Sequence, residues 1–332
     1  PGRHPLEQVL AEMKRHFGDV WTDLGQLEET ENRRFVDAVV DAEPNHLDEV
    51  FRATLHQRTQ GHPLFTIELL RAMKERGDLL QEGGAWMASP SLDWKRLPAR
   101  VEAVIEGRVG RLDEKLHDIL AVAAVEGERF TAQVAAQVLS VSELQVLRQL
   151  NEELDNHHRL VREIGEETVG GQIVSQYEFS HALFQKHVYD RLGSAEKRIL
   201  HNQIGTALEN LYGDQAGQIA VKLAMHFSDA DVPGKAWPYY ALAAEEAARV
   251  YACTEVVDHY RRALELVRRV DIDSQNLVRL YAGLGRAFEL NSEFDQAVAV
   301  YEEMEDVSHE RGDRVVELAA LMANAAIKAV PT

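Results

Sequence analysis

Two short motifs contain the residues best suited to bind an anionic ligand. His181 closes the run Tyr177-Glu178-Phe179-Ser180-His181 and begins a predicted helix. The free N–H groups and the dipole of a helix N-terminus favour an anion, and an imidazole can donate a hydrogen bond to a phosphate oxygen. The second motif, Gly61-His62-Pro63-Leu64, lies between two predicted helices. Each has a purely structural alternative: Gly ends and Pro starts helices without any ligand, and His181 alone would be an ordinary, partly exposed histidine.

Neither motif is accompanied by a phosphate loop. The pattern G-x-x-x-x-G-K-[ST] occurs nowhere in the 332 residues, and the Gly234-Lys235 pair has no glycine at the required offset. A phosphate loop needs clustered backbone N–H groups, a lysine on the phosphates and a hydroxyl on Mg²⁺. We therefore assign no catalytic residue and expect no ATP hydrolysis by this chain alone.

Other chemistry is weakly represented. No H-E-x-x-H, C-x-x-C or G-x-S-x-G motif occurs, and His157-His158 lacks a third ligand, so no metal site is expected. Ser194-Ala195-Glu196-Lys197 has no companion motif and is interpreted as a helix start. The single Cys253 excludes an internal disulfide, is typical of a reducing cytoplasm, and is predicted to be a buried small hydrophobe.

Composition limits the partners. The net charge is −19, from 55 acidic and 36 basic residues, which favours solubility and argues against a non-specific grip on nucleic acid or anionic lipid. The apolar run Ile119–Val125 is too short to span a bilayer, and no signal peptide is visible, so a cytoplasmic location is expected. The absence of an initiator Met fits an excised fragment.

The elements that must position these motifs are almost all helical. Residues 1–92 predict a small helical bundle, with helices over 5–17, 31–41, from Asn45 or Asp48 to about 58, and over 63–77, followed by a linker at Gly83-Gly84 and 88–91. Gly61 ends one helix and Pro63 starts the next, which is the usual punctuation of helix termini.

Residues 93–192 predict a winged-helix domain. Helices are expected from Pro98, over 116–125, 132–139 and 142–156, and two alternating segments, 159–164 and 173–179, predict a hairpin with a turn-rich tip at 165–171. The helix from Ser142 would be the recognition helix of a DNA-binding protein. It carries four acids against Arg148 alone, so direct nucleic-acid binding is not expected.

Residues 193–332 predict a helical solenoid. The segment from Tyr260 matches that from Tyr301 at an offset of 41, and Ala244 falls on Gly285 at the same offset. This resembles the tetratricopeptide (TPR) pattern of small residues where two helices cross, with a period longer than the standard ~34 residues. Residues 315–330 match the first helix of another repeat. An array that stops there leaves an uncapped apolar face.

The order of these motifs resembles that of STAND-class signalling ATPases, over about residues 45–330. The similarity is to large ATP-binding LuxR-type regulators and to the ATPase–TPR portion of adenylate-cyclase-like proteins, C-terminal to their phosphate-loop core. The residues that carry it are Gly61 to Leu70, Leu97 to Val101, Gly107 to Leu112, Ala123 to Gly127, Phe130, Phe179-Ser180-His181 and Leu200-His201.

The resemblance implies a nucleotide switch. Gly61, Pro63 and Leu64 would lie against the adenine of ATP or ADP, and His181 would contact the β-phosphate of ADP and favour a closed form. Only the histidine of the usual Met-His-Asp motif is present here, as Phe179-Ser180-His181-Ala182. The implied partners are an upstream ATPase core and a protein or small-molecule inducer on the TPR surface, with homo-oligomerisation on activation and no nucleotide on the isolated chain.

Two other functions remain open from the sequence. One is a nucleotide-independent scaffold whose TPR groove docks a protein, and the other is a winged-helix DNA-binding protein. The output domain, the inducer and the pathway are not encoded in any motif.

Overall fold

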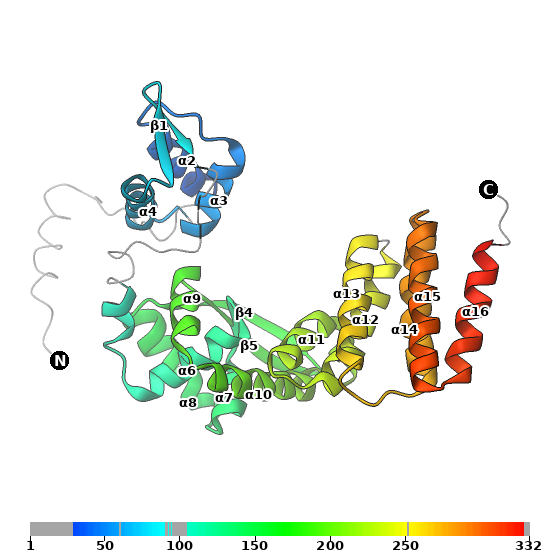
Figure 1. The fold of residues 1–332 in the computed structure, drawn as a ribbon. Coiled ribbons are helices and arrows are strands. Elements are labelled where there is room, and N and C mark those ends of the chain that lie inside the picture. The colour runs from blue at the N-terminus through cyan, green and yellow to red at the C-terminus, as the bar shows by residue number, and fades with distance from the viewer. Residues whose placement is uncertain are drawn as a thin grey trace, which may run out of the picture. The chain divides into compact units, whose positions relative to one another are not determined.

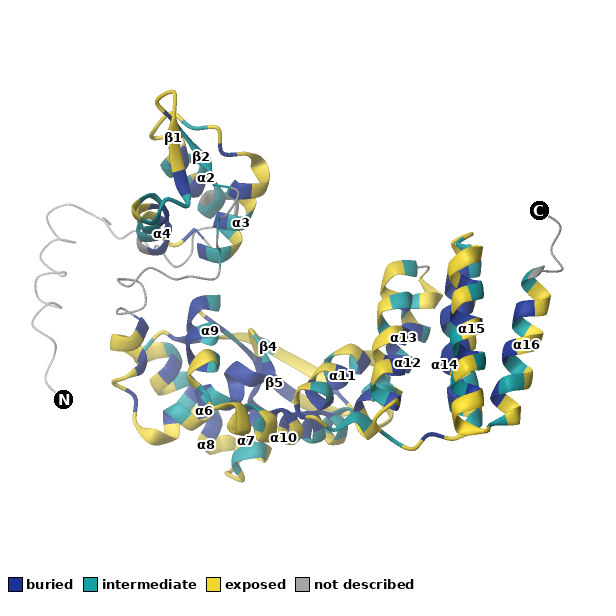
Figure 2. Cartoon of the chain, viewed as in Figure 1, coloured by how far each residue is buried: buried dark blue, intermediate teal, exposed yellow. Residues whose placement is uncertain are grey.

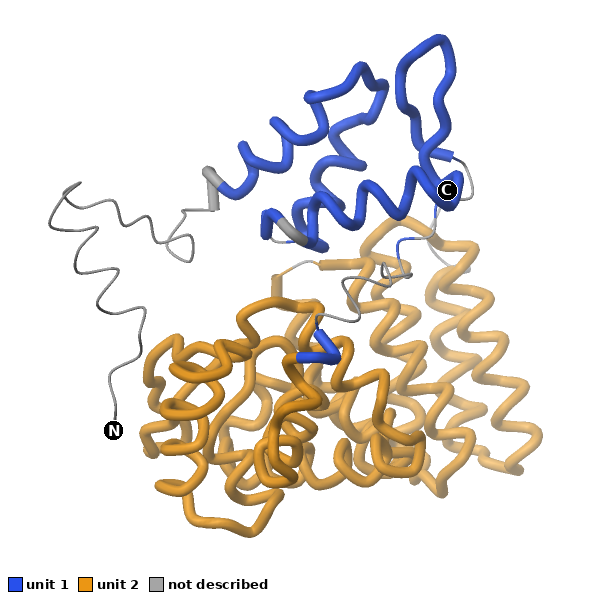
Figure 3. The backbone as a smooth tube through the Cα atoms, turned by 90° about the vertical axis from the view of Figure 1, so that its left-hand side faces the viewer, with its two compact units in different colours: residues 1–107 blue, residues 108–332 orange. Residues whose placement is uncertain are grey.

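The computed structural model describes residues 29–59, 61–89, 92, 94, 105–250 and 252–328. The chain divides into two compact units, residues 1–107 and 108–332 (Figure 3). The described part is mainly helical with small antiparallel sheets (Figure 1), which confirms the predicted mainly α fold class. The predicted helix over 5–17 and the predicted helix start at Pro98 lie outside the described residues.

The first unit packs three helices against a short hairpin. Its elements are α2 (Glu29–Val40), α3 (Glu49–Thr59), α4 (Pro63–Arg76), β1 (Leu79–Glu82) and β2 (Ala85–Ala88). Asp48 caps α3, because its Oδ1 accepts a hydrogen bond from the backbone N–H of Phe51 at 2.8 Å. The core of this unit is built from the buried side chains of Val36, Val40, Leu47, Phe51, Leu55, Leu69, Leu70, Met73 and Leu79.

The predicted linker at Gly83-Gly84 is wrong. These glycines form the two-residue turn between β1 and β2, with φ of 60° and 87°. A two-residue turn with positive φ at both positions matches the twist of a hairpin, and glycine adopts it without strain. The sequence does not predict these strands, because each has only four residues and only one buried position. Apolar and polar residues therefore do not alternate along them.

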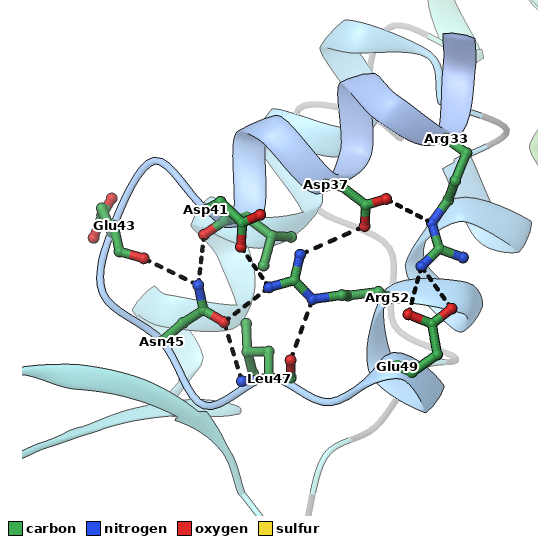
Figure 4. A network of polar contacts seen from close by, with 9 residues as sticks. Arg33, Asp37, Asp41, Glu43, Asn45, Leu47, Glu49 and Arg52 are labelled. Carbon is green, nitrogen blue, oxygen red and sulfur yellow. Dashed lines mark hydrogen bonds and ion pairs between the residues drawn. The ribbon is translucent and has the colours of Figure 1, made fainter. Parts of the chain in front are cut away.

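Charged side chains fasten α2 to α3 and to the segment between them (Figure 4). Arg52 on α3 donates hydrogen bonds to Asp41 at 2.5 Å and to the carbonyl oxygen of Leu47 at 3.3 Å. Arg33 on α2 donates to both carboxylate oxygens of Glu49, at 2.8 and 3.0 Å. Exposed ion pairs contribute only about 0–1 kcal/mol each, so the main effect of this network is to fix the path of the connection.

The second unit begins with helices and a three-stranded sheet, here called the hairpin region (residues 108–192). It contains α6 (Glu114–Glu126), β3 (Arg129–Thr131), α7 (Ala132–Leu139), α8 (Glu143–Arg148), the π-helix η2 (Gln149–His157), β4 (Val161–Val169), β5 (Gln172–Phe179) and α9 (Ala182–Arg191). The sheet is antiparallel in the order β3-β5-β4. The predicted hairpin is therefore confirmed.

The tip of that hairpin is shorter than predicted. β4 does not stop at Ile164 but continues to Val169, because Gly165 lies inside the strand beside a register shift after Glu163. The turn is the pair Gly170-Gly171, both with positive φ. A β-bulge accommodates one extra residue and bends the strand. Gly165 therefore lies within the strand and does not begin the loop that the sequence predicts.

The rest of the second unit is a stack of helices. They are α10 (Ser194–Tyr212), the 3₁₀ segment η3 (Gly213–Ile219), α11 (Ala220–Asp229), α12 (Pro233–Arg249), α13 (Cys253–Val267), α14 (Ser274–Leu290), α15 (Phe294–Arg311) and α16 (Arg314–Lys328). Each helix from α10 to α13 packs on the next, and α14, α15 and α16 continue the stack (Figure 1). Cys253 is the first residue of α13 and is half-buried, which corrects its predicted full burial.

The 41-residue offset is confirmed by the helix boundaries. α12 and α14 begin at 233 and 274, and α13 and α15 begin at 253 and 294, so both pairs differ by 41 (274 − 233 and 294 − 253). Tyr260 and Tyr301 are both buried, as are Ala244 and Gly285. Figure 2 shows buried segments along each of the helices α13, α14 and α15. The two helix pairs therefore use equivalent positions to build one continuous core.

The predicted small residue at a helix crossing is present in α14. A Cβ added to Gly285 would lie 2.3 Å from Cζ of Tyr301 on α15, and one added to Gly283 would lie 2.4 Å from Cζ of Tyr260 on α13. Real Cβ atoms do not approach other atoms this closely. Two glycines on opposite sides of α14 thus admit one tyrosine from each neighbouring helix.

The outer face of α16 is apolar and exposed. Leu318, Leu321 and Met322 are 60%, 47% and 65% exposed, whereas the residues 41 positions earlier, Leu277, Leu280 and Tyr281, are at most 2% exposed. In α14 those positions are covered by packing within the stack. The expected apolar face is therefore present and exposed on α16.

Candidate functional site

Gly61 occupies a tight turn that only glycine fits. Its φ is +70°, and an added Cβ would lie 2.6–2.8 Å from Asn32 on α2, including backbone atoms. The backbone N–H of Gly61 donates to Oγ1 of Thr59 at 3.3 Å, and Thr66 donates its hydroxyl to the same oxygen at 3.0 Å. The first unit alone therefore requires a glycine at this position, with or without a ligand.

Pro63 is the first residue of α4 and is half-buried. His62 is exposed, stacks on Phe65 with ring centroids 4.4 Å apart, and provides no side-chain cap for the helix. Leu64 lies in the first turn of α4, and its side chain is outside the described residues. The backbone carbonyl of His62 accepts the first helical hydrogen bond, from the N–H of Thr66 at 2.9 Å.

His181 is buried, being 3% exposed, and caps α9. Its Nδ1 accepts a hydrogen bond from the backbone N–H of Leu183 at 3.0 Å. A neutral imidazole that accepts at Nδ1 carries its proton on Nε2. His181 is therefore buried and not partly exposed, but its role as a helix cap is compatible with the structural alternative that needs no ligand. Its Nε2 bears the proton.

The strand and loop before His181 fix its backbone on both sides. The N–H of Phe179 donates to the carbonyl of Glu128 at 3.0 Å, and that of Ser180 donates to the carbonyl of Leu160 at 2.9 Å. The start of α9 is therefore tied to β3 and β4. Gly61, Pro63 and Leu64 belong to the first compact unit and His181 to the second, so the structure describes the two motifs separately.

The hairpin tip is docked on the helical stack. The backbone N–H of Gly170 donates to Oε1 of Gln215 in η3 at 3.2 Å. Gly170 has φ of +56°, and an added Cβ would lie 2.5 Å from the carbonyl oxygen of Leu211 at the end of α10. A DNA-binding wing needs a free tip to reach the duplex, and this tip is already in contact with protein.

A buried carboxylate joins the hairpin region to the stack. The side chain of Glu126 is 1% exposed and accepts hydrogen bonds from the backbone N–H and hydroxyl of Thr131, at 3.1 and 3.0 Å. It also accepts one from Nζ of Lys222 on α11, at 3.0 Å. A buried carboxylate that lost such a partner would remain uncompensated, at a cost of about 3–5 kcal/mol. Sequence reasoning missed Glu126, although a single acid directly after the apolar run 119–125 was the available signal.

Two histidines pair inside the start of the stack. Nδ1 of His201 on α10 and Nδ1 of His226 on α11 are 2.9 Å apart, and Nε2 of His201 is 3.2 Å from the hydroxyl of Tyr189. Burial, followed by the proximity of His201, lowers the pKa of His226 to about 3, and burial also lowers the pKa of His201. Both are therefore neutral at pH 7, and one Nδ1 donates to the other.

The exposed face of the predicted recognition helix does not suit DNA. Across α8 and η2 it presents Glu143, Glu152 and Glu153 against Arg148. Phosphates would meet net negative charge on this face. The described residues contain no group of three or more His, Cys, Asp or Glu placed to hold a metal. No described helix is both long and apolar enough to cross a membrane.

The comparisons with known proteins give one distant similarity. No family model matches the chain, and no curated protein matches it. Among solved structures, the chain is similar to a Signal Transduction ATPase with Numerous Domains (STAND) protein with a tetratricopeptide repeat sensor from Pyrococcus horikoshii, at 11% identity and a TM-score of 0.25. The match covers 94% of this chain and 58% of that protein, so the chain spans less than two thirds of its length.

Proposed function

We propose that this chain is the regulatory and sensor segment of a STAND-class signalling or transcription-regulatory ATPase, which gates a bound nucleotide and docks a partner or inducer through its TPR-like repeats. The observation that carries the proposal is the direct joint between the hairpin region, which holds His181, and the array of 41-residue helix pairs. A ligand on the array and a nucleotide at His181 would then act on one connected body, which is what coupling between two sites requires.

The nucleotide role rests on the chemistry of the two motifs, Gly61-Pro63 and His181. The Nε2–H of His181 is a donor of the kind that a β-phosphate oxygen of ADP accepts, and the turn at Gly61 and Pro63 would lie against the adenine. ADP would favour the closed form, and ATP with an inducer would favour an open, oligomerising form. Hydrolysis would need the phosphate loop of an upstream core, because this chain has no such motif.

The proposal is tested first on the gene and then on the protein. The coding DNA upstream of the codon for Pro1 should contain an in-frame G-x-x-x-x-G-K-[ST] motif. In the protein that includes this core, His181→Asn should speed ADP release, because the asparagine side chain can still cap α9 but has no imidazole. An authentic start codon at Pro1, or ADP retention unchanged by the substitution, would refute nucleotide gating.

A nucleotide-independent scaffold is the second candidate. The continuous core of the helix array favours it independently of any nucleotide. It predicts full partner binding by this chain alone, whatever the variant at His181.

A further inference from the structure

A large cavity lies where the hairpin region meets the helical stack. Its walls come from the end of α6 and the start of β3, from η3 and α11, and from the facing ends of α12 and α13. The volume is about 1190 Å³. Pockets for drug-sized molecules are roughly 300–1,000 Å³, so this one has room for a short segment of polypeptide.

One wall of the cavity is apolar and open to solvent. Val221 and Met225 stand one turn apart on α11 and are 43% and 50% exposed, and Val250 at the end of α12 is 74% exposed. Exposed large apolar side chains that gather in a concave surface mark a binding site more often than isolated ones do. A ligand that buries them gains about 25 cal/mol for each Å² of apolar surface removed from water.

The charge around this wall is unbalanced. Each of the three cations that line the cavity already has an acidic partner: Lys222 with Glu126 at 3.0 Å, Arg249 with Glu246 at 2.8 Å, and Arg129 with Glu178 at 3.3 Å.

Three acids of the lining lack such a partner. Glu128, Asp214 and Glu255 form no ion pair with any residue that the structure describes. They come from three different elements around the rim: the α6–β3 connection, η3 and α13. A cationic ligand would therefore find uncompensated carboxylates on several sides, whereas an anion would be repelled.

We propose that this cavity binds a short basic peptide segment. Apolar side chains of the peptide would pack against Val221, Met225 and Val250. Its lysine or arginine side chains would pair with Glu128, Asp214 and Glu255. The lining of the cavity includes the Glu126–Lys222 pair that joins the hairpin region to the stack. The peptide would thus bind at the joint itself. This proposal rests on the docking part of the proposed function and is independent of nucleotide gating.

The test uses this chain and synthetic peptides in fluorescence anisotropy at physiological ionic strength. The probe is a fluorescein-labelled decapeptide of lysine, leucine and glycine. Two companion peptides replace every lysine by glutamate or every leucine by serine. We expect the lysine–leucine peptide to bind with a micromolar Kd and both companions to bind at least about tenfold more weakly.

Two sets of protein variants locate the site. The triple variant Glu128→Lys, Asp214→Lys and Glu255→Lys should weaken binding by about tenfold or more, and Met225→Ser, which removes apolar surface without changing the charge, should weaken it by several-fold. The matched control reverses three exposed acids of α15, by Glu302→Lys, Asp306→Lys and Glu310→Lys, with the same change in net charge. It should leave the Kd within about twofold.

Three results would overturn the proposal. They are no binding of the lysine–leucine peptide up to about 1 mM, equal weakening by the control on α15, and equal binding of the serine companion. The second and third would mean that the net charge of −19 attracts any cation without using the cavity. None of them bears on ADP retention at His181, so this proposal can fail while nucleotide gating stands.

Discussion

Replacing Gly285 by alanine should destabilise the helical stack, although alanine is the better helix former. Gly285 lies inside α14, where the substitution would by itself stabilise the helix by about 0.5–1 kcal/mol. The added Cβ, however, would lie 2.3 Å from Cζ and 2.5 Å from the hydroxyl oxygen of Tyr301. Tyr301 is 3% exposed and belongs to the core of the stack, so either its ring or the whole of α15 must move to accommodate the new Cβ.

The magnitude follows from what the movement disrupts. Overpacking a well-filled core costs about 1–3 kcal/mol. The hydroxyl of Tyr301 donates to Glu289 at 2.8 Å, and displacing it loses a hydrogen bond of about 1 kcal/mol. Subtracting the gain in helix propensity leaves a net loss of about 1–3 kcal/mol in the free energy of unfolding.

The assay is urea unfolding followed by circular dichroism, with hydrogen exchange of the α14 amides to localise the effect. Gly234→Ala in the first turn of α12 is the matched control, because nothing lies within 4 Å of its added Cβ, and it should gain about 0.4–1 kcal/mol. In a Tyr301→Ala background, Gly285→Ala should become stabilising by about 0.5–1 kcal/mol, which gives a coupling energy of about 1.5–4 kcal/mol between the two positions. A penalty that persists without the tyrosine ring, or a Gly285→Ala variant as stable as the control, would refute the close-crossing argument.

Three further predictions concern the histidines and the turn at Gly61. Burial lowers the pKa of His226 to about 3 in the folded protein, whereas it is near 6.5 in the unfolded chain. Protonation below about pH 6.5 therefore favours the unfolded chain, and the free energy of unfolding should fall by about 2 kcal/mol between pH 7 and pH 5 because of this one group. His226→Phe should flatten the dependence of the urea midpoint on pH, and an unchanged slope would contradict this. His181→Ala should lower the free energy of unfolding by at least about 1 kcal/mol, because α9 loses its N-cap, and His181→Asn should recover most of that loss. Equal thermal stability of the two variants would argue against the cap. Gly61→Ala should destabilise the first unit by about 1 kcal/mol more than Gly77→Ala does, because both glycines have positive φ but only Gly61 also meets a neighbour; equal losses on urea unfolding would show that this contact is unimportant.

Much of the fold was predictable because its signals are local. The Gly61–Pro63 punctuation, the alternation in the two long strands and the 41-residue offset each depend on neighbouring residues or on a period within the chain. Helix termini and strand alternation are fixed by backbone sterics and by which face is buried, so they can be read from a sequence. The expectation that His181 begins a helix held for the same reason.

The features that were missed depend on contacts between distant residues. The hairpin β1–β2 is stabilised by backbone hydrogen bonds between residue 86 and residues 44 and 46, which no local pattern reveals. The cavity forms where segments about 130 positions apart in the chain meet, and its three unpaired acids are unremarkable in a sequence with 55 of them.

By itself, the sequence determined the helical character, the repeat period, the absence of a phosphate-loop motif and the position of His181 at a helix start, because each depends on residue type and short-range spacing. The tertiary structure alone decided that His181 is buried and holds its proton on Nε2, that the hairpin tip is docked on the stack, and that Glu126 and Lys222 join the two parts. Burial, protonation and ion pairing depend on which atoms surround a group in space, and those atoms come from residues 2 to 96 positions away.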